Sequence, residues 1–209
     1  LGAHALWARA TPVGTVDGVA WGAWQAGDWG RLDHRAAAGA LELGLQPALL
    51  PSLRPWLRVW AFHGGGDRDA GDARHGTFFN GLPTPRPFAR FPFHNLMNVS
   101  QRAVTLALRP GTRLALRGDL SSVRLASASD LWYAGGGAFE RASFGYAGRP
   151  TGGARALATL ADLSADLRLS PRLGLAAYVA RAAAGDAVRA VYPGTRPAWL
   201  SYVELDVRR

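Results

Sequence analysis

The stretch NVSQRAVTLALRPGTRLALRGDLSSVRLA, residues 98–126, contains two runs in which apolar and polar side chains alternate. RPGT separates the runs and supplies Pro, Gly and Thr for a tight reversal. Because successive side chains of a strand point to opposite faces, the pattern predicts a long hairpin with one apolar and one polar face. The apolar face comprises Val104, Leu106, Leu108, Leu114, Leu116 and Leu120. The polar face comprises Gln101, Thr105, Arg109, Arg113, Arg117, Asp119 and Ser121.

The chain has 209 residues and a formal charge of +9, and all of its basic residues other than His are arginines. Such an excess favours an acidic partner, which could be nucleic acid, anionic lipid or a polyanionic substrate. The absence of Cys excludes disulfides and thiolate metal sites. The sequence contains no run of 18 apolar residues, so no transmembrane helix is predicted.

Alternation with a period of two recurs along the chain, whereas helical spacing is scarce. Nine strands are predicted, at 3–12, 17–27, 33–46, 54–63, 97–109, 112–125, 156–169, 172–182 and 198–208. Most are longer than the five or six residues typical of soluble proteins, and a tilted strand needs roughly 9–11 residues to cross a bilayer.

The connections between the predicted strands alternate in length. Short turns fall near 13–16, 47–53, 109–112 and 170–172, and the brief 28–32 departs from the alternation. Long connections rich in Gly and Pro fall at 64–96, 126–155 and 183–197. Transmembrane barrels have this asymmetry, with short turns in the periplasm and longer loops outside. We therefore predict an all-β, antiparallel transmembrane β-barrel in which residues 1–209 form a single domain.

An odd count of nine strands is unusual for a bacterial barrel. With short turns in the periplasm, the C-terminus lies there and residue 1 lies outside the cell. The chain is therefore predicted to be the C-terminal part of a larger barrel.

Other strands repeat the two-faced pattern of the hairpin. In the predicted strand 156–169, leucine and alanine alternate with polar residues that include Asp162, Asp166 and Arg168. In the last predicted strand, valine and leucine alternate with Glu204, Asp206 and Arg208. A soluble antiparallel sheet is the ordinary alternative, but these apolar faces contain few aromatics that could interlock in a core. Aromatics gather instead near predicted strand ends, as interfacial girdles do: Trp7, Trp24, Trp29, Trp132, Tyr133, Tyr192 and Trp199. We expect the apolar faces to contact lipid and the polar faces to line a wet lumen.

Four blocks of the sequence are similar to the alginate export family of outer-membrane porins. They are GDRDAGDARHGTFFNGLPTPRPFARFPFHNLMN at 66–98, DLWYAGGGAFERASFGYAGRPTGG at 130–153, AWGAWQAGDWG at 20–30 and SYVELDVRR at the end. The sequence departs from the family pattern at its last residue, because it has Arg209 where the resemblance implies Phe. The resemblance implies a barrel of about eighteen strands, of which this chain provides roughly half.

The resemblance also implies passive export of an anionic uronic-acid polysaccharide such as alginate through an arginine-lined lumen in the bacterial outer membrane. Guanidinium groups pair well with polymer carboxylates, and interleaved acids would hold the arginines in place. The residues predicted to line the pore and bind substrate are Arg58, Arg102, Arg113, Arg117, Asp119, Asp162, Asp166, Arg168, Glu204, Asp206 and Arg208. The implied partners are the polysaccharide, outer-membrane lipid and periplasmic proteins that deliver the polymer.

Other chemistries find little support in the sequence. The chain has no G-x-S-x-G elbow, no phosphate loop and no metal-binding His spacing, so we expect no enzyme activity and no cofactor. Asp67, Asp69 and Asp72 lack the remaining ligands of a calcium loop and are expected to form a solvated turn. An RNA-binding sheet would not explain the long strands, so no nucleic-acid partner is predicted. The alternatives are a general anion-selective porin for small solutes and a soluble β-sheet protein that binds an acidic ligand.

Overall fold

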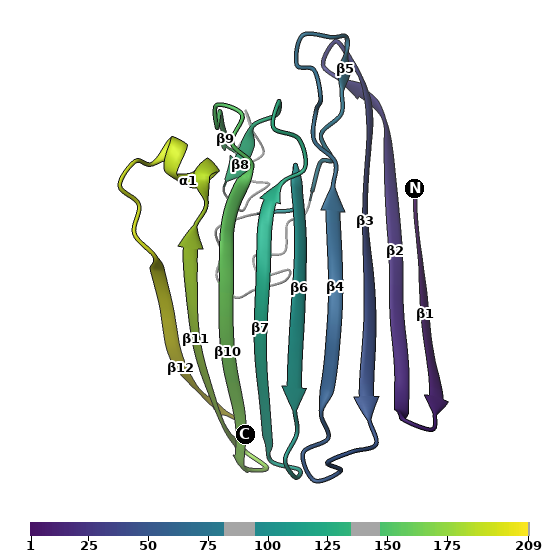
Figure 1. Cartoon of the computed structure of the whole chain (residues 1–209), viewed down its shortest axis with the longest axis vertical. Coiled ribbons are helices and arrows are strands. Elements are labelled where there is room, and N and C mark those ends of the chain that lie inside the picture. The colour runs from purple at the N-terminus through teal and green to yellow at the C-terminus, as the bar shows by residue number, and fades with distance from the viewer. Residues whose placement is uncertain (82–94, 135–146, 209) are drawn as a thin grey trace.

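The computed structural model describes residues 1–81, 95–134 and 147–208. Parts of two blocks that carry the family resemblance, 82–94 and 135–146, lie outside the described residues, and so does Arg209. The described chain forms one large antiparallel sheet whose long strands follow one another in chain order (Figure 1). These strands are β1 (Gly2–Thr11), β2 (Gly14–Trp29), β3 (Leu32–Pro47), β4 (Trp56–Gly64), β6 (Val99–Leu108), β7 (Leu114–Leu125), β10 (Ala156–Ser170), β11 (Leu173–Ala184) and β12 (Ala198–Val207). All nine correspond to predicted strands.

Four small elements were not predicted, and all of them belong to the long connections. β5 (Arg74–His75) pairs in parallel with the start of β3, and β8 (Trp132–Ala134) pairs with β9 (Ala147–Arg149). The short helix α1 (Asp186–Val191) precedes β12. Among the described residues, no helix has the length and apolar character needed to cross a membrane.

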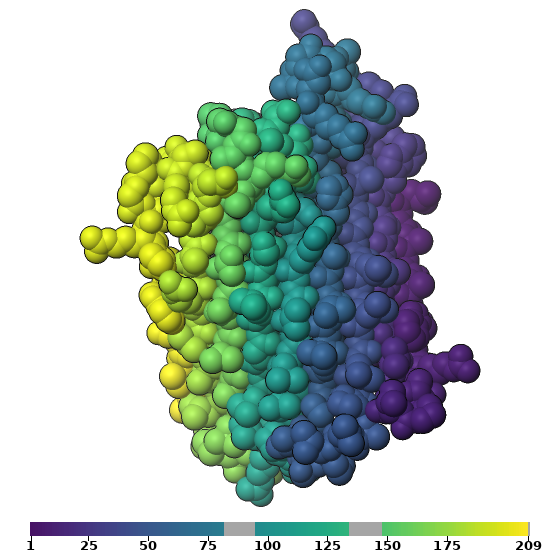
Figure 2. All heavy atoms as spheres, viewed as in Figure 1, coloured from purple at the N-terminus to yellow at the C-terminus, as the bar shows by residue number. Residues whose placement is uncertain are grey.

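Short and long connections lie at opposite ends of the sheet, as predicted, except that the brief turn between β2 and β3 lies at the end of the long connections (Figure 1). The short turns need backbone conformations that favour glycine: Gly14 has φ +137° and Gly111 has φ +75°. Gly14 also lies so close to the Gln46 carbonyl oxygen that a Cβ atom there would collide with it. The strands lie side by side without a break from β1 to β12 (Figure 2).

The sheet is open. Within the described residues, β1 pairs only with β2, and β12 pairs only with β11. Unpaired backbone amides and carbonyls at such edges are very costly in hydrocarbon, so a membrane-spanning sheet has to close into a barrel. The fold is therefore an all-β antiparallel sheet with two open edges, which is consistent with part of a larger barrel.

The buried core lies on one face of the sheet, near the long connections. Phe62, Leu125, Leu157 and Leu160 are almost fully buried there, and loop and helix residues pack over them. Trp132 belongs to this cluster and is only 5% exposed, so it does not take part in an interfacial girdle. The cluster covers the long-connection end of this face and leaves the remainder to polar side chains.

Candidate functional site

Pairing between strands brings the predicted polar residues of distant segments into one row. Arg58 of β4 lies opposite Thr105 of β6, which lies opposite Asp119 of β7. Asp119 in turn lies opposite Asp162 of β10. Because directly opposed residues project from the same face, these four side chains share the face that carries the buried core. We call this the polar face.

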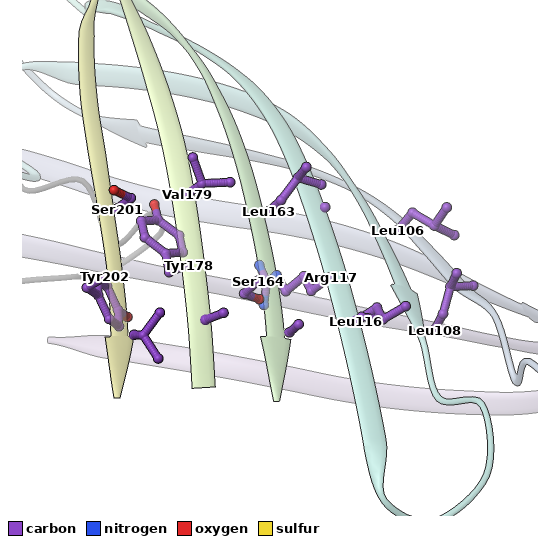
Figure 3. Close-up of a pocket in the computed structure, with 14 residues that line it drawn as sticks. Leu106, Leu108, Leu116, Arg117, Leu163, Ser164, Tyr178, Val179, Ser201 and Tyr202 are labelled. Carbon is purple, nitrogen blue, oxygen red and sulfur yellow. The ribbon is translucent and has the colours of Figure 1, made fainter. Parts of the chain in front are cut away.

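A second row lies next to the first, toward the short turns. It contains Trp56, Arg117, Ser164, Tyr178 and Tyr202. Figure 3 shows Arg117 next to Ser164, with Tyr178 and Tyr202 on the neighbouring strands. The rings of the two tyrosines are 5.3 Å apart. This row therefore combines one cation, Arg117, with the aromatic rings and hydroxyl groups of two tyrosines.

The Arg117 guanidinium is fixed by a two-pronged interaction with Asp119. Its Nε and Nη2 atoms donate to the two carboxylate oxygens at 2.6 and 2.8 Å. The Thr105 hydroxyl donates to the same carboxylate at 2.5 Å. The Arg117 side chain remains 44% exposed. Arg117 is thus oriented by its partner while part of its charged group stays accessible.

Arg58 is held in a different way. It forms an ion pair with Glu42, and its guanidinium lies 4.3 Å from the centre of the Trp56 ring. The Trp56 indole N–H donates to Asp17 Oδ2 at 2.9 Å. Asp17 and Glu42 are absent from the predicted site. Glu42 alternates with leucines and could have been found from that pattern, whereas the small residues around Asp17 give no clear alternation.

Asp162 is the most buried acid of the two rows, with 6% exposure. The Tyr178 hydroxyl donates to its Oδ1 atom. Its Oδ2 atom has no hydrogen-bond partner among the described residues. A buried carboxylate oxygen is costly to leave unmatched, so this atom is suited to accept a hydrogen bond from an enclosed water molecule.

The remaining predicted residues gather at the short-turn end. Asp166 and Glu204 share one row through Ala176, and Arg168 and Asp206 share the next through Gly174. Arg113 lies in the turn before β7, where its carbonyl oxygen accepts a hydrogen bond from the Arg168 amide at 2.8 Å. Arg208 follows β12 and forms an exposed ion pair with Asp206 at 2.9 Å. The sheet therefore brings Arg113, Arg168 and Arg208 to one mouth.

Arg102 does not share the face of the other predicted site residues. It lies opposite Ala61 and Ser122, and within β6 it alternates in phase with Val104 and Leu106. The prediction of a common face with Arg58 and Arg117 was therefore wrong. The reason is the strict period of two, since an even-numbered residue of β6 shares the face of the apolar residues, not that of Gln101 and Thr105.

A sequence model of the alginate export family matches residues 10–199, which is most of the chain. The chain belongs to the alginate export family. No curated protein matches it. The family is an outer-membrane transport family, and its domain supports a polysaccharide export channel.

The polar face of this alginate export chain is not a continuous arginine lining. The described strands place three arginines on it, namely Arg58, Arg117 and Arg168. They place seven carboxylates on it, namely Asp17, Glu42, Asp119, Asp162, Asp166, Glu204 and Asp206. On the described strands this face therefore has more carboxylates than arginines, and the basic excess of the chain lies elsewhere.

The long connections are anchored by a buried carboxylate, Asp130, which is 7% exposed. Its two oxygens accept hydrogen bonds from the Thr77 hydroxyl, the Asp67 and Leu131 amides and the Tyr133 hydroxyl, at 2.6–2.9 Å. Burial, together with the adjacent Asp130, raises the pKa of Tyr133 above its ordinary value, so the phenol stays a donor.

The acidic run that invited a calcium hypothesis forms local turns. Asp67 accepts from the Asp69 amide, Asp69 from the Gly71 amide and Asp72 from the Arg74 amide, at 2.7–3.2 Å. Carboxylates used in this way shape the backbone of the loop. Among the described residues no group of acids and histidines is arranged to hold a metal ion.

Proposed function

We propose that the chain forms part of a passive outer-membrane channel for an anionic polysaccharide, with the polar face toward the lumen and the apolar face toward lipid. The observation that carries the proposal is the family match together with the two polar rows, which run across β4, β6, β7 and β10. The opposite face supports it, because Leu41, Leu120, Leu163 and Val203 are 57–72% exposed there. Such a surface is suited to lipid and unsuited to water, which disfavours the soluble alternative.

The proposed orientation places the short turns in the periplasm. A polymer delivered from that side meets Arg113, Arg168 and Arg208 first. These cations lower the cost of bringing a polymer carboxylate out of bulk water. They lie near Asp166, Glu204 and Asp206. These carboxylates reduce the positive electrostatic field at the mouth and keep polymer binding weak enough for the polymer to pass.

At mid-height the polymer meets Arg58 and Arg117. Each guanidinium is already paired with a carboxylate of the protein, Glu42 or Asp119. A passing uronate can therefore interact with the guanidinium weakly and reversibly. Ser164 lies beside Arg117 and is only partly buried, so its hydroxyl can bind a sugar hydroxyl. Charge recognition and hydroxyl recognition would thus lie side by side, which suits a chain that carries both groups in every unit.

The test is ion selectivity of the complete protein in a planar bilayer under a salt gradient. Arg117→Glu should shift the reversal potential toward cations, because it reverses the one partly exposed cation of the second row. Arg102→Glu makes the same charge change on the other face and should leave the reversal potential unchanged. Equal shifts in both variants, or none in Arg117→Glu, would overturn the assignment of the polar face to the lumen.

A general anion-selective porin for small solutes remains the second candidate function. The observation that favours it is that both mid-height arginines are paired, which suits transient contact with any small anion. The two candidates differ in one respect: a polyuronate should block the current of an export channel and leave that of a small-solute porin unchanged.

A further inference from the structure

Several arginines lie on the apolar face, at the end that carries the long connections. Arg102 of β6 lies opposite Ser122 of β7, and Arg124 of β7 lies opposite Ser100 of β6. His63 of β4 lies opposite Ser100. Arg102 and Arg124 are therefore diagonal neighbours with hydroxyl groups between them. We call His63, Ser100, Arg102, Ser122 and Arg124 the basic rim.

The charges of the basic rim are not neutralised by the described part of the chain. Arg102 and Arg124 are exposed, and neither has an ion pair or side-chain hydrogen bond with a described residue. In the described residues, the apolar faces of β4, β6, β7, β10, β11 and β12 carry no carboxylate. Arg35 of β3 differs, because Asp33 pairs with it at 2.9 Å.

The basic rim borders the apolar band directly. Val104, Leu106 and Leu120 follow it toward the short turns and are 44–58% exposed. On β11, Arg181 lies in the same row as Leu120, through Ala161 of β10, and its guanidinium is 5.9 Å from the centre of the Trp199 ring. A cationic strip with hydroxyl donors above an exposed apolar band matches a lipid that has an anionic headgroup and acyl chains.

We propose that the basic rim binds the phosphate headgroup of an outer-leaflet glycolipid. This rests on the proposed function, because it requires the apolar face to contact lipid and the long connections to lie outside. Guanidinium forks match phosphate oxygens in pairs, and the hydroxyls of Ser100 and Ser122 can complete the coordination. The band below would hold the acyl chains. The arginine excess thus serves anchorage to the outer leaflet as well as transport.

The experiment uses the complete protein in neutral detergent, titrated with bisphosphorylated lipid A or with phosphatidylcholine and followed by native mass spectrometry. Arg102→Gln with Arg124→Gln should weaken lipid A binding by about tenfold or more, because each lost charge near a phosphate costs about tenfold or somewhat less. Phosphatidylcholine binding should not change. The matched control, Arg109→Gln with Arg172→Gln, removes two exposed arginines from the short turns and should retain lipid A binding.

Two results would overturn the proposal: equal weakening in both double variants, which would indicate a net-charge effect, or no weakening in the rim variant. Channel recordings of the same samples separate this outcome from failure of the proposed function. The rim variant should conduct with unchanged selectivity. A shifted reversal potential would mean that the rim residues face the lumen, and a protein that needs no detergent would contradict the membrane assignment itself.

Discussion

At the scale of single residues, Asp130 shows how one carboxylate can join two loops that are far apart in sequence. It accepts hydrogen bonds from Asp67 and Thr77 in one long connection and from Leu131 and Tyr133 in another. Hydrogen bonds to a charged group are worth more than neutral ones. The fold of these loops over the polar face therefore depends on the four hydrogen bonds that Asp130 accepts.

Asp130→Asn should loosen both connections. In either orientation, the amide NH2 of the asparagine would face two hydrogen-bond donors that now contact one oxygen of Asp130. We therefore expect the local free energy of opening of these loops to fall by about 2–4 kcal/mol. Hydrogen exchange of the Asp67 and Leu131 amides measures it. Asp69→Asn is the control, because Asp69 is exposed and an asparagine oxygen can still accept from the Gly71 amide. Unchanged protection in Asp130→Asn would show that other contacts hold the loops.

A second prediction at this scale concerns pH. His34 and His75 share a hydrogen bond between their Nδ1 atoms at 2.8 Å, and the Trp29 ring stacks on His75 at 4.4 Å. Burial, and then the neighbouring His34, lower the pKa of His75 below its ordinary 6.5, although Asp67 and Asp130 act in the opposite direction. The folded state thus binds the proton less readily than the unfolded loop. Attachment of β5 to β3 should be full above pH 6.5 and weaken as the pH falls.

Protection of the β5 amides, corrected for intrinsic exchange, should therefore decrease from pH 7.5 to about pH 5. His75→Gln should abolish this dependence, whereas His4→Gln, on β1 and outside the cluster, should preserve it. A dependence that survives in His75→Gln would assign it to another group.

At the scale of elements, alternation with a period of two was sufficient to predict every long strand of the described residues, and the two faces of those strands in which the alternation is clear. It works because a strand in a two-faced sheet cannot slip by one residue without exchanging its faces. Arg102 was assigned to the wrong face because the prediction relied on its charge and not on its position in the alternation, which it shares with Val104 and Leu106. Asp17 was missed because the small residues around it show no clear alternation, and its partner Trp56 comes from a strand two positions away in the sheet.

The short elements could not be predicted in the same way. β5 has two residues, and its pairing with β3 depends on the contact between His34 and His75. The buried cluster under the long connections was also missed. Leu157 and Leu160 belong to a strand with alternating faces, and nothing in their own segment reveals that loops fold over them.

Adjacent residues of β10 provide a direct test of the two faces. Leu163→Arg places a charge on the apolar face, where Leu163 is 62% exposed, and should cost about 2–4 kcal/mol of folding free energy in lipid vesicles near the midplane. Ser164→Arg places the same side chain on the polar face and should cost much less. Denaturant titration in vesicles measures both. Similar costs would mean that the strand register is wrong.

At the scale of the whole molecule, the two open edges determine what the chain can do alone. β1 and β12 each have one described neighbour, so this sheet of nine long strands and the short β5 would expose two rows of unpaired backbone groups in lipid. We expect the 209 residues alone to give no stable conducting pore and to be cleaved by protease at β1 and β12. The complete protein should conduct and resist cleavage there. A stable pore from the chain alone would contradict the partial-barrel interpretation.

The central claim is that the polar face lines a channel for acidic polysaccharide. The most direct measurement is the current through the complete protein in a planar bilayer under a salt gradient, with a polyuronate or a neutral polysaccharide of the same length added to one side. We predict that polyuronate blocks the current, that this block falls with rising salt and that the neutral polymer gives no block. A current that neither polymer blocks, or that both block equally, would contradict it.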